Sequence, residues 1–190
     1  MDPAEEFRDV AGRFGTAVHG VTDGGWDAPA PVEGWAARDV VRHLVEWFPG
    51  FLAGGSDVTL PPTGSVDDDP VGTWDAFADS VQAVLDDPAT ADRAFTNRHT
   101  GDLPLANAIS QFFTADVFMH TWDLARATGQ DDTLDAERCR VMVEGMAPYD
   151  ELLRSSGQYG PRVPVPDDAD PQTRLLAFIG RAPNWRRVAK

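Results

Sequence analysis

The sequence predicts an all-α protein, a four-helix bundle with extra short helices and a C-terminal extension. Three observations lead to this class. Apolar residues recur at steps of three or four along several segments of the 190-residue chain, a spacing that places them on one face of a helix. Glycine and proline gather between those segments and end them. The predicted helices are longer than average and their loops vary in length, as is typical of bundles.

The first half of the chain carries three of the predicted helices. Each has an apolar stripe of the kind that faces a core. The first helix stops at Gly24 and Gly25 and the second at Gly54 and Gly55, because glycine costs backbone entropy inside a helix. The three helices, with part of each stripe, are 3–21 (Phe7, Val10, Phe14), 36–53 (Val40, Leu44, Phe48) and 71–85 (Trp74, Phe77, Val81).

A non-helical stretch and the longest periodic segment follow. Residues 86–104 are expected to be non-helical, with a short hairpin that turns at Gly101 and Asp102. Residues 105–128 form the longest run with helical periodicity, and Gly129 closes it. This segment is therefore the fourth helix of the predicted bundle.

The C-terminal part is expected to extend the bundle. A fifth helix is predicted at about 135–155 and a short last helix at 173–179, joined by the Pro-rich connector 157–170. A chain of this length is typical of a single domain. We expect one metal-binding helical-bundle domain over 1–190, with 156–190 packed on it as an extension.

The charge balance narrows the function classes. The chain has 16 Lys and Arg against 31 Asp and Glu, a net charge of −15. We therefore expect no nucleic-acid partner and no membrane partner, because phosphate backbones and anionic lipids attract clustered basic residues. No apolar run approaches the ~18 residues of a membrane span, and no signal-peptide pattern is visible, so we expect a cytoplasmic protein. The single cysteine, Cys139, excludes an internal disulfide and is expected to be a buried structural thiol.

Two histidines fall inside predicted helices. His43 lies in the second helix, on the face that carries Trp47. His120 lies in the fourth helix, with Asp116 four residues before it and Asp123 three residues after it. Residues at these spacings share one helix face. Because ionisable groups are costly in an apolar setting unless they are paired or metal-bound, we expect these residues to have partners.

A metal site is one interpretation of this pattern. Asp116 and His120, at i and i+4, would supply two ligands, and His43 from a facing helix would supply the third. Three protein ligands of this type with an open fourth position are typical of catalytic zinc, and nickel or iron would also suit them. The spacing alone leaves the alternative open, in which Asp116 and His120 form an ordinary intrahelical pair and His43 is a core histidine.

Two segments and the tail resemble a known family. The segments are WAARDVVRHLVE at 35–46 and DVFMHTWDLARATG at 116–129, and the tail runs from VPVPDDA at 163–169 to GRAPNW at 180–185. They resemble the DinB/YfiT-like superfamily, in the actinobacterial branch similar to the metal-binding domain of mycothiol-dependent maleylpyruvate isomerase. The resemblance covers essentially the whole chain. The two segments are more specific together, at this separation, than either is alone.

The resemblance implies a DinB-like four-helix bundle with one divalent metal between helices. Carried over, the metal ligands are His43, Asp116 and His120, with Asp116 standing where the isomerase pattern has Glu. The implied metal is zinc, with nickel or iron as alternatives, and the implied function is a mycothiol-dependent transferase or isomerase. Its partners would be a small-molecule substrate and a low-molecular-weight thiol such as mycothiol, and the protein could form a homodimer. A non-catalytic module that binds a small ligand or a metal is the alternative.

Other residues are weaker candidates. Asp123 is expected either to hydrogen-bond a ligand histidine or to pair with Arg126 on the helix surface. His99 is expected to be an exposed loop residue, although it could reach a pocket. Arg181 could bind a substrate carboxylate, but a surface or capping role is the simpler interpretation. We expect loops 56–69 and 95–104 to shape the pocket.

Overall fold

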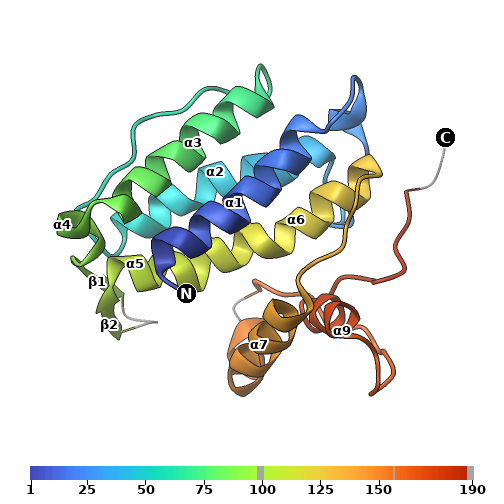
Figure 1. The fold of residues 1–190 in the computed structure, drawn as a ribbon. Helices are drawn as coiled ribbons and strands as arrows, with labels where there is room; N and C mark the ends of the chain where they lie inside the picture. The colour runs from blue at the N-terminus through green and yellow to red at the C-terminus, as the bar shows by residue number, and fades with distance from the viewer. Residues whose placement is uncertain (98–100, 156, 188–190) are drawn as a thin grey trace.

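Four long helical segments lie side by side in the computed structural model and form the predicted bundle (Figure 1). The structure describes residues 1–97, 101–155 and 157–187. Helix α1 packs on both α3 and α6, and α2 packs on the same two helices. The bundle segments are α1 (Pro3–His19), α2 (Ala37–Ala53), α3 (Pro70–Asp86) and the continuous run of α5 (Leu105–Ala108), the π-helix η2 (Ile109–Thr114) and α6 (Ala115–Thr128).

The ends of these helices carry the expected signals. Asp69 precedes α3, and its side chain accepts a hydrogen bond from the backbone N–H of Gly72 at 2.9 Å. Pro70, at the first position, lacks the N–H that would otherwise be left without a partner. Helix α6 ends at Gly129, which has a φ of 75° and adopts the left-handed conformation common after a helix. Local sequence therefore sets where these helices stop.

The fourth predicted helix contains a wider turn. Residues 109–114 adopt π-helical geometry between two α-helical pieces. Phe113 lies in this stretch and is fully buried, stacked on Phe48 of α2 with ring centroids 4.1 Å apart. The prediction of one helix over 105–128 is confirmed in extent, and the change of winding lies directly before the turn that carries Asp116. π-helical turns are frequent next to functional sites.

The hairpin forms, but the predicted turn position is wrong. Strands β1 (Ala94–Asn97) and β2 (Gly101–Pro104) pair antiparallel. Gly101 pairs with Asn97 and Asp102 pairs with Thr96 inside the ladder, so neither residue forms the turn. Residues 98–100, between the two strands in the sequence, lie outside the part of the chain that the structure describes. The register places Leu103 opposite the fully buried Phe95, and burial of this aromatic ring sets the register in place of local turn propensity. The same stretch, expected to be non-helical, also contains the short helix α4 (Pro88–Ala91).

The single helix predicted at 135–155 is interrupted. The structure has α7 (Ala136–Met146), a 3₁₀ turn η3 (Ala147–Tyr149) and α8 (Asp150–Ser155). Pro148 lies in the 3₁₀ turn, and its ring and missing N–H break α-helical hydrogen bonding. The last helix, α9 (Pro171–Phe178), packs on α7. Figure 1 shows these two helices together beside α6, outside the four-helix bundle.

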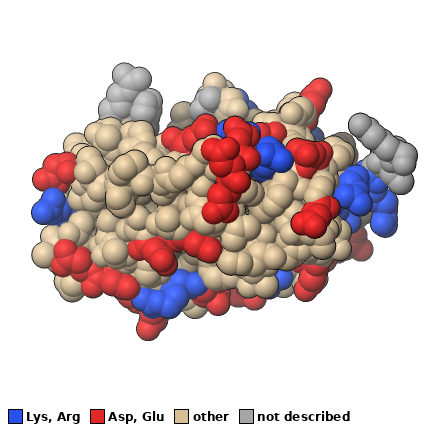
Figure 2. All heavy atoms as spheres, turned by 90° about the horizontal axis from the view of Figure 1, so that it is seen from above, with Lys and Arg blue, Asp and Glu red and all other residues tan. Residues whose placement is uncertain are grey.

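The buried side chains form a single connected core. Large aromatic residues of all four bundle segments contribute to it, and Leu175 of α9 and Cys139 of α7 belong to the same cluster. Burial of Cys139 confirms the expected structural thiol. Acidic side chains are spread over the face seen from above (Figure 2). Within the described ranges, no helix has both the length and the hydropathy needed to cross a bilayer.

Candidate metal centre

Three side chains from two facing helices converge inside the bundle. His43 projects from α2, and Asp116 and His120 project from successive turns of α6. The Nε2 atom of His43 lies 3.1 Å from Asp116 Oδ2, and Nε2 of His120 lies 3.5 Å from Asp116 Oδ1. One nitrogen or oxygen atom from each of the three lies within 4.8 Å of the others. The structure therefore brings together all three residues that the sequence predicted as ligands.

Access to this cluster is graded. The exposed fraction of the side chain is 33% for His43, 19% for Asp116 and 6% for His120. Trp35 covers part of the cluster, because its ring is stacked on His120 with centroids 5.8 Å apart and lies 5.1 Å from the ring of His43. Solvent therefore reaches the site from the side of His43, while His120 forms its buried wall.

A second tryptophan orients the carboxylate. Nε1 of Trp47, one turn after His43 on α2, donates a hydrogen bond to Asp116 Oδ2 at 2.9 Å. From the sequence, Trp47 is predicted to share the face of His43, without a role at the site. The i, i+4 spacing from His43 was the signal that could have identified it.

The other nitrogen of His120 is held by a buried ion pair. Nδ1 of His120 lies 2.9 Å from Oδ2 of Asp123, whose side chain is 1% exposed. Nε and Nη2 of Arg181 donate hydrogen bonds to the same carboxylate at 3.0–3.2 Å. This arrangement leaves Nε2 as the ring nitrogen of His120 that faces Asp116 and His43.

Burial and charge act in opposite directions on this pair. Burial alone would raise the pKa of Asp123, but the hydrogen bond from His120 and the charge of Arg181 outweigh it and hold that pKa below its ordinary value. Burial likewise acts to lower the pKa of His120. The negative charges of Asp116 and Asp123 outweigh it, so the pKa of His120 is raised. The site thus favours positive charge at the position of His120.

These contacts decide the weaker candidates. Asp123 bonds the predicted ligand His120, which was one of its two expected roles, and Arg126 pairs instead with Asp132 at 2.6 Å. The expectation of a surface or capping role for Arg181 is wrong, because its side chain reaches the buried Asp123 from beyond α9. His99 lies outside the described residues.

Tyr159 lies close enough to Asp116 to feel its charge, and no sequence pattern predicts this position. Its hydroxyl lies 3.9 Å from the sulfur of Met119 and 3.6 Å from that of Met146, which are weak acceptors. Burial raises the pKa of Tyr159 to about 12, with a further contribution from the charge of Asp116. Its segment, 157–170, shows no helical periodicity that could have indicated this position.

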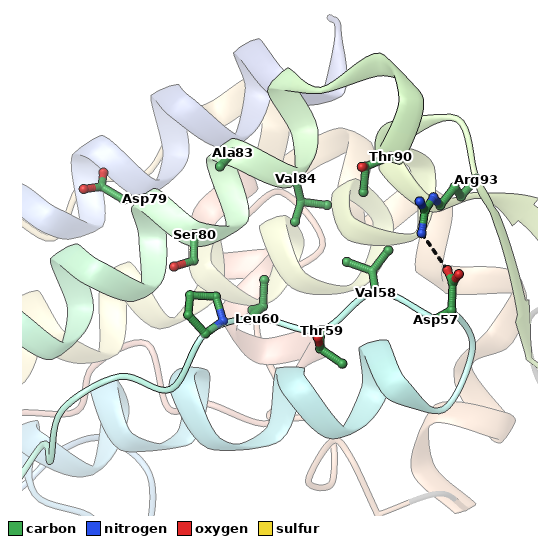
Figure 3. Close-up of a pocket in the computed structure, with 11 residues that line it drawn as sticks. Asp57, Val58, Thr59, Leu60, Asp79, Ser80, Ala83, Val84, Thr90 and Arg93 are labelled. Carbon is green, nitrogen blue, oxygen red and sulfur yellow. Dashed lines mark hydrogen bonds and ion pairs between the residues drawn. The ribbon is translucent and has the colours of Figure 1, made fainter.

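Two cavities of the structure differ in their relation to the cluster. One, of about 610 Å³, is lined by residues 57–61, by α3 and by Arg93, which pairs with Asp57 (Figure 3). Loop 56–69 thus shapes a cavity, but none of the three predicted ligands lines it. A second groove, of about 720 Å³, is lined by residues 29–36 and Trp185 and includes Trp35. Trp35 lines this groove and also contacts the rings of His43 and His120, so it lies between the groove and the cluster.

The distances fit a divalent metal ion. Zinc bound by nitrogen and oxygen ligands at 2.0–2.2 Å in tetrahedral geometry separates two ligand atoms by about 3.3 Å. Nε2 of His43 lies 3.1 Å from Asp116 Oδ2, which is also the length of a direct hydrogen bond, and Nε2 of His120 lies 3.5 Å from Oδ1. Each histidine is thus at about the zinc-site separation from one of the two carboxylate oxygens. Two imidazoles and a carboxylate also match the ligand types of open zinc sites. The fold and the cluster together define a helical-bundle protein with a candidate metal centre.

Comparison with known proteins gives the family. The chain belongs to the mycothiol maleylpyruvate isomerase N-terminal domain family, which matches residues 7–125. The match contains His43, Asp116 and His120 and ends before α7. Two curated relatives, both described as uncharacterized proteins of Mycobacterium tuberculosis, from strains CDC 1551 and H37Rv, are each 28% identical over 193 residues, covering 95% of this chain and 98% of the relative. No solved structure matches the chain.

Proposed function

We propose that the protein is a metal-dependent enzyme that uses a small thiol of the mycothiol type to transfer or isomerise a group on a small molecule. The observation that carries the proposal is the convergence of His43, Asp116 and His120 at distances suited to one divalent ion. The choice of thiol rests on the family, which is named for mycothiol maleylpyruvate isomerase. Zinc is the proposed metal, since two imidazoles and a carboxylate are ligands it commonly takes.

Each side chain of the cluster has a separate task. His43 and His120 would bind the metal through Nε2, and Asp116 through a carboxylate oxygen. Trp47 holds Oδ2 of Asp116 in place, which limits the freedom of a side chain one methylene shorter than the Glu of the isomerase pattern. When bound, a divalent metal lowers the pKa of a coordinated thiol or water and so provides a nucleophile at neutral pH.

The surroundings would bind and orient the substrate. The 33% exposed His43 side marks the entrance, and Trp35 connects the cluster to the groove that also holds Trp185. The groove combines two tryptophans and several small apolar residues with three acidic side chains and one arginine, and small-molecule sites commonly pair apolar walls with a few polar groups. In the proposed site, the thiol therefore binds at the metal and the second reactant enters from the groove. We further propose that the chain is a single domain that includes residues 156–190, that it acts in the cytoplasm, and that it forms a homodimer.

The first experiment is metal analysis of the purified, tag-free protein. We expect about one zinc per chain, lost in His43→Ala and in His120→Ala. His19→Ala is the matched control. His19, at the end of α1, is an exposed histidine that pairs with Asp75 of α3, and neither residue belongs to the candidate ligand set. Retention of stoichiometric metal in His120→Ala would contradict the assignment, as would absence of metal from the wild type after reconstitution.

A second measurement separates an enzyme from a non-catalytic metal module. Zinc-loaded protein would be titrated with mycothiol and the direct binding heat recorded, with apoprotein as control. Binding that requires zinc supports thiol activation at an open metal position. A bound metal with no thiol affinity, together with a large loss of thermal stability on chelation, would favour the module.

A further inference from the structure

The segment after α9 passes so close to the backbone of the 157–170 connector that only glycine fits at the contact. Gly180 has a φ of 84°, and a Cβ atom placed on it would lie 2.9 Å from the backbone of Gly160. Arg154 contacts both segments of this crossing, because its guanidinium donates hydrogen bonds to the carbonyl oxygens of Gly160 and Phe178. The next residue, Arg181, is tied back to the end of α9 by a backbone hydrogen bond to Leu176 at 2.8 Å. The direction in which Arg181 leaves the backbone is therefore fixed.

Arg181 reaches from this crossing to the carboxylate that holds His120. Its Nε and Nη2 atoms contact both oxygens of Asp123 at 3.0–3.2 Å, a two-point geometry that lysine cannot reproduce. Within the described part of the chain, every hydrogen bond to Oδ1 of Asp123 comes from Arg181, and Oδ2 also serves His120. Removing Arg181 would take the positive charge of the guanidinium away from a buried carboxylate and leave the contact with His120 as its remaining anchor.

We propose that Arg181 is a positioning residue of the metal centre that acts on His120 through Asp123. The segment 160–181, which lies outside the matched family domain of 7–125, is then part of the site. This inference rests on the proposed metal function. It assigns Arg181 to the orientation of a metal ligand, in contrast to direct contact with a substrate carboxylate.

The test compares zinc affinity in four full-length proteins by competition with a chromophoric chelator. Asp123→Asn should weaken zinc binding by about 10–100-fold, the usual effect of losing the hydrogen-bond partner of a ligand histidine. Arg181→Met should weaken it by about tenfold. Because both residues act along one path, the double variant should bind zinc no more weakly than Asp123→Asn alone.

A control and a conservative variant separate positioning from general stability. Arg162 lies in the same segment and pairs with Asp150, so Arg162→Met should bind zinc like the wild type. Arg181→Lys keeps the charge and loses the two-point contact, so its affinity should lie between those of wild type and Arg181→Met. It also provides a folded protein if Arg181→Met does not fold. The cobalt(II) absorption spectrum of each variant reports ligand geometry. A changed spectrum is expected for Arg181→Met, for Asp123→Asn and for the double variant, and an unchanged one for Arg162→Met.

The outcomes distinguish this inference from the proposed function. Wild-type zinc affinity in Arg181→Met, or effects of the two substitutions that add in the double variant, would overturn the positioning role while the metal function stands. Absence of zinc from the wild type would overturn both. Loss of zinc in His120→Ala with an unchanged cobalt spectrum in Arg181→Met would again leave only the proposed function.

Discussion

The indole of Trp47 and the carboxylate of Asp116 are joined by a 2.9 Å hydrogen bond across the interface between α2 and α6. The bond ends on Oδ2, the oxygen that also faces His43, while Oδ1 faces His120. One neutral donor thus orients the only carboxylate of the proposed ligand set. It does so without introducing a positive charge that would oppose a metal ion.

Replacing Trp47 tests this relationship. Trp47→Phe keeps an aromatic ring in the interface and removes the N–H, so Asp116 should lose its fixed orientation. We expect zinc affinity to fall about tenfold and the free energy of unfolding to fall by about 1 kcal/mol. Competition titration and chemical denaturation measure the two effects. Trp26→Phe is the control, because Trp26 is a half-buried tryptophan in the 3₁₀ helix Gly25–Asp27 and packs against the core. Equal zinc affinity in both variants would show that the indole N–H of Trp47 has no such role.

Two glycines near the end of α2 should respond in opposite ways to alanine. A Cβ on Gly55 would overlap the ring of Phe95, which is fully buried and stacked on Phe51 at 4.7 Å. Because this ring cannot move aside, Gly55→Ala should destabilise the protein by about 1–3 kcal/mol. A Cβ on Gly50 meets nothing within 4 Å, so Gly50→Ala should stabilise α2 by up to about 1 kcal/mol. Thermal denaturation of the pair measures the contrast, and destabilisation of equal size in both would contradict it.

Cys139 should be unreactive in the folded protein. It is fully buried in α7, and burial raises the pKa of its thiol to about 12, with a smaller contribution from the charge of Asp135. Since the thiolate is the reactive form, labelling by a thiol reagent at neutral pH should be slow in buffer and rapid in denaturant. Mass spectrometry of timed samples measures this, and rapid labelling of the native protein would show that α7 opens readily.

Tyr159 should make stability fall at alkaline pH. Its pKa in the folded protein is about 12, above its ordinary value of 10.0, because burial disfavours the phenolate. The folded state therefore keeps a proton that the unfolded state releases, and the stabilising contribution is complete below pH 10 and lost as the pH rises toward 12. The free energy of unfolding, measured by chemical denaturation at several pH values between 10 and 12, should fall more steeply with pH for the wild type than for Tyr159→Phe. Tyr149→Phe, at an exposed tyrosine, should behave like the wild type, and a wild-type slope in Tyr159→Phe would contradict the prediction.

Local chemistry explains why much of the fold was predictable. The stripe that includes Phe48 and the stop at Gly54 are properties of one segment, so periodicity and glycine identified α2 within one residue of its observed start. Pro148 is also visible in the sequence, and its ring and missing N–H are the physical reason why the single helix predicted over 135–155 gives way to a 3₁₀ turn after Met146. The hairpin turn was misplaced because burial of Phe95, a tertiary contact, sets the register.

The sequence by itself determined the bundle and the shared face of Asp116 and His120, because helical periodicity fixes which residues of one helix lie together. The resemblance of two segments to a known family added His43, from another helix, to the candidate ligand set. Only the tertiary structure decided the partners of that set. The packing of α2 on α6 brings Trp47 to Asp116, and the crossing of Gly160 and Gly180 brings Arg181 to Asp123. Contacts between residues 58 positions apart, such as Asp123 and Arg181, depend on how whole segments pack against each other, and no local spacing encodes that.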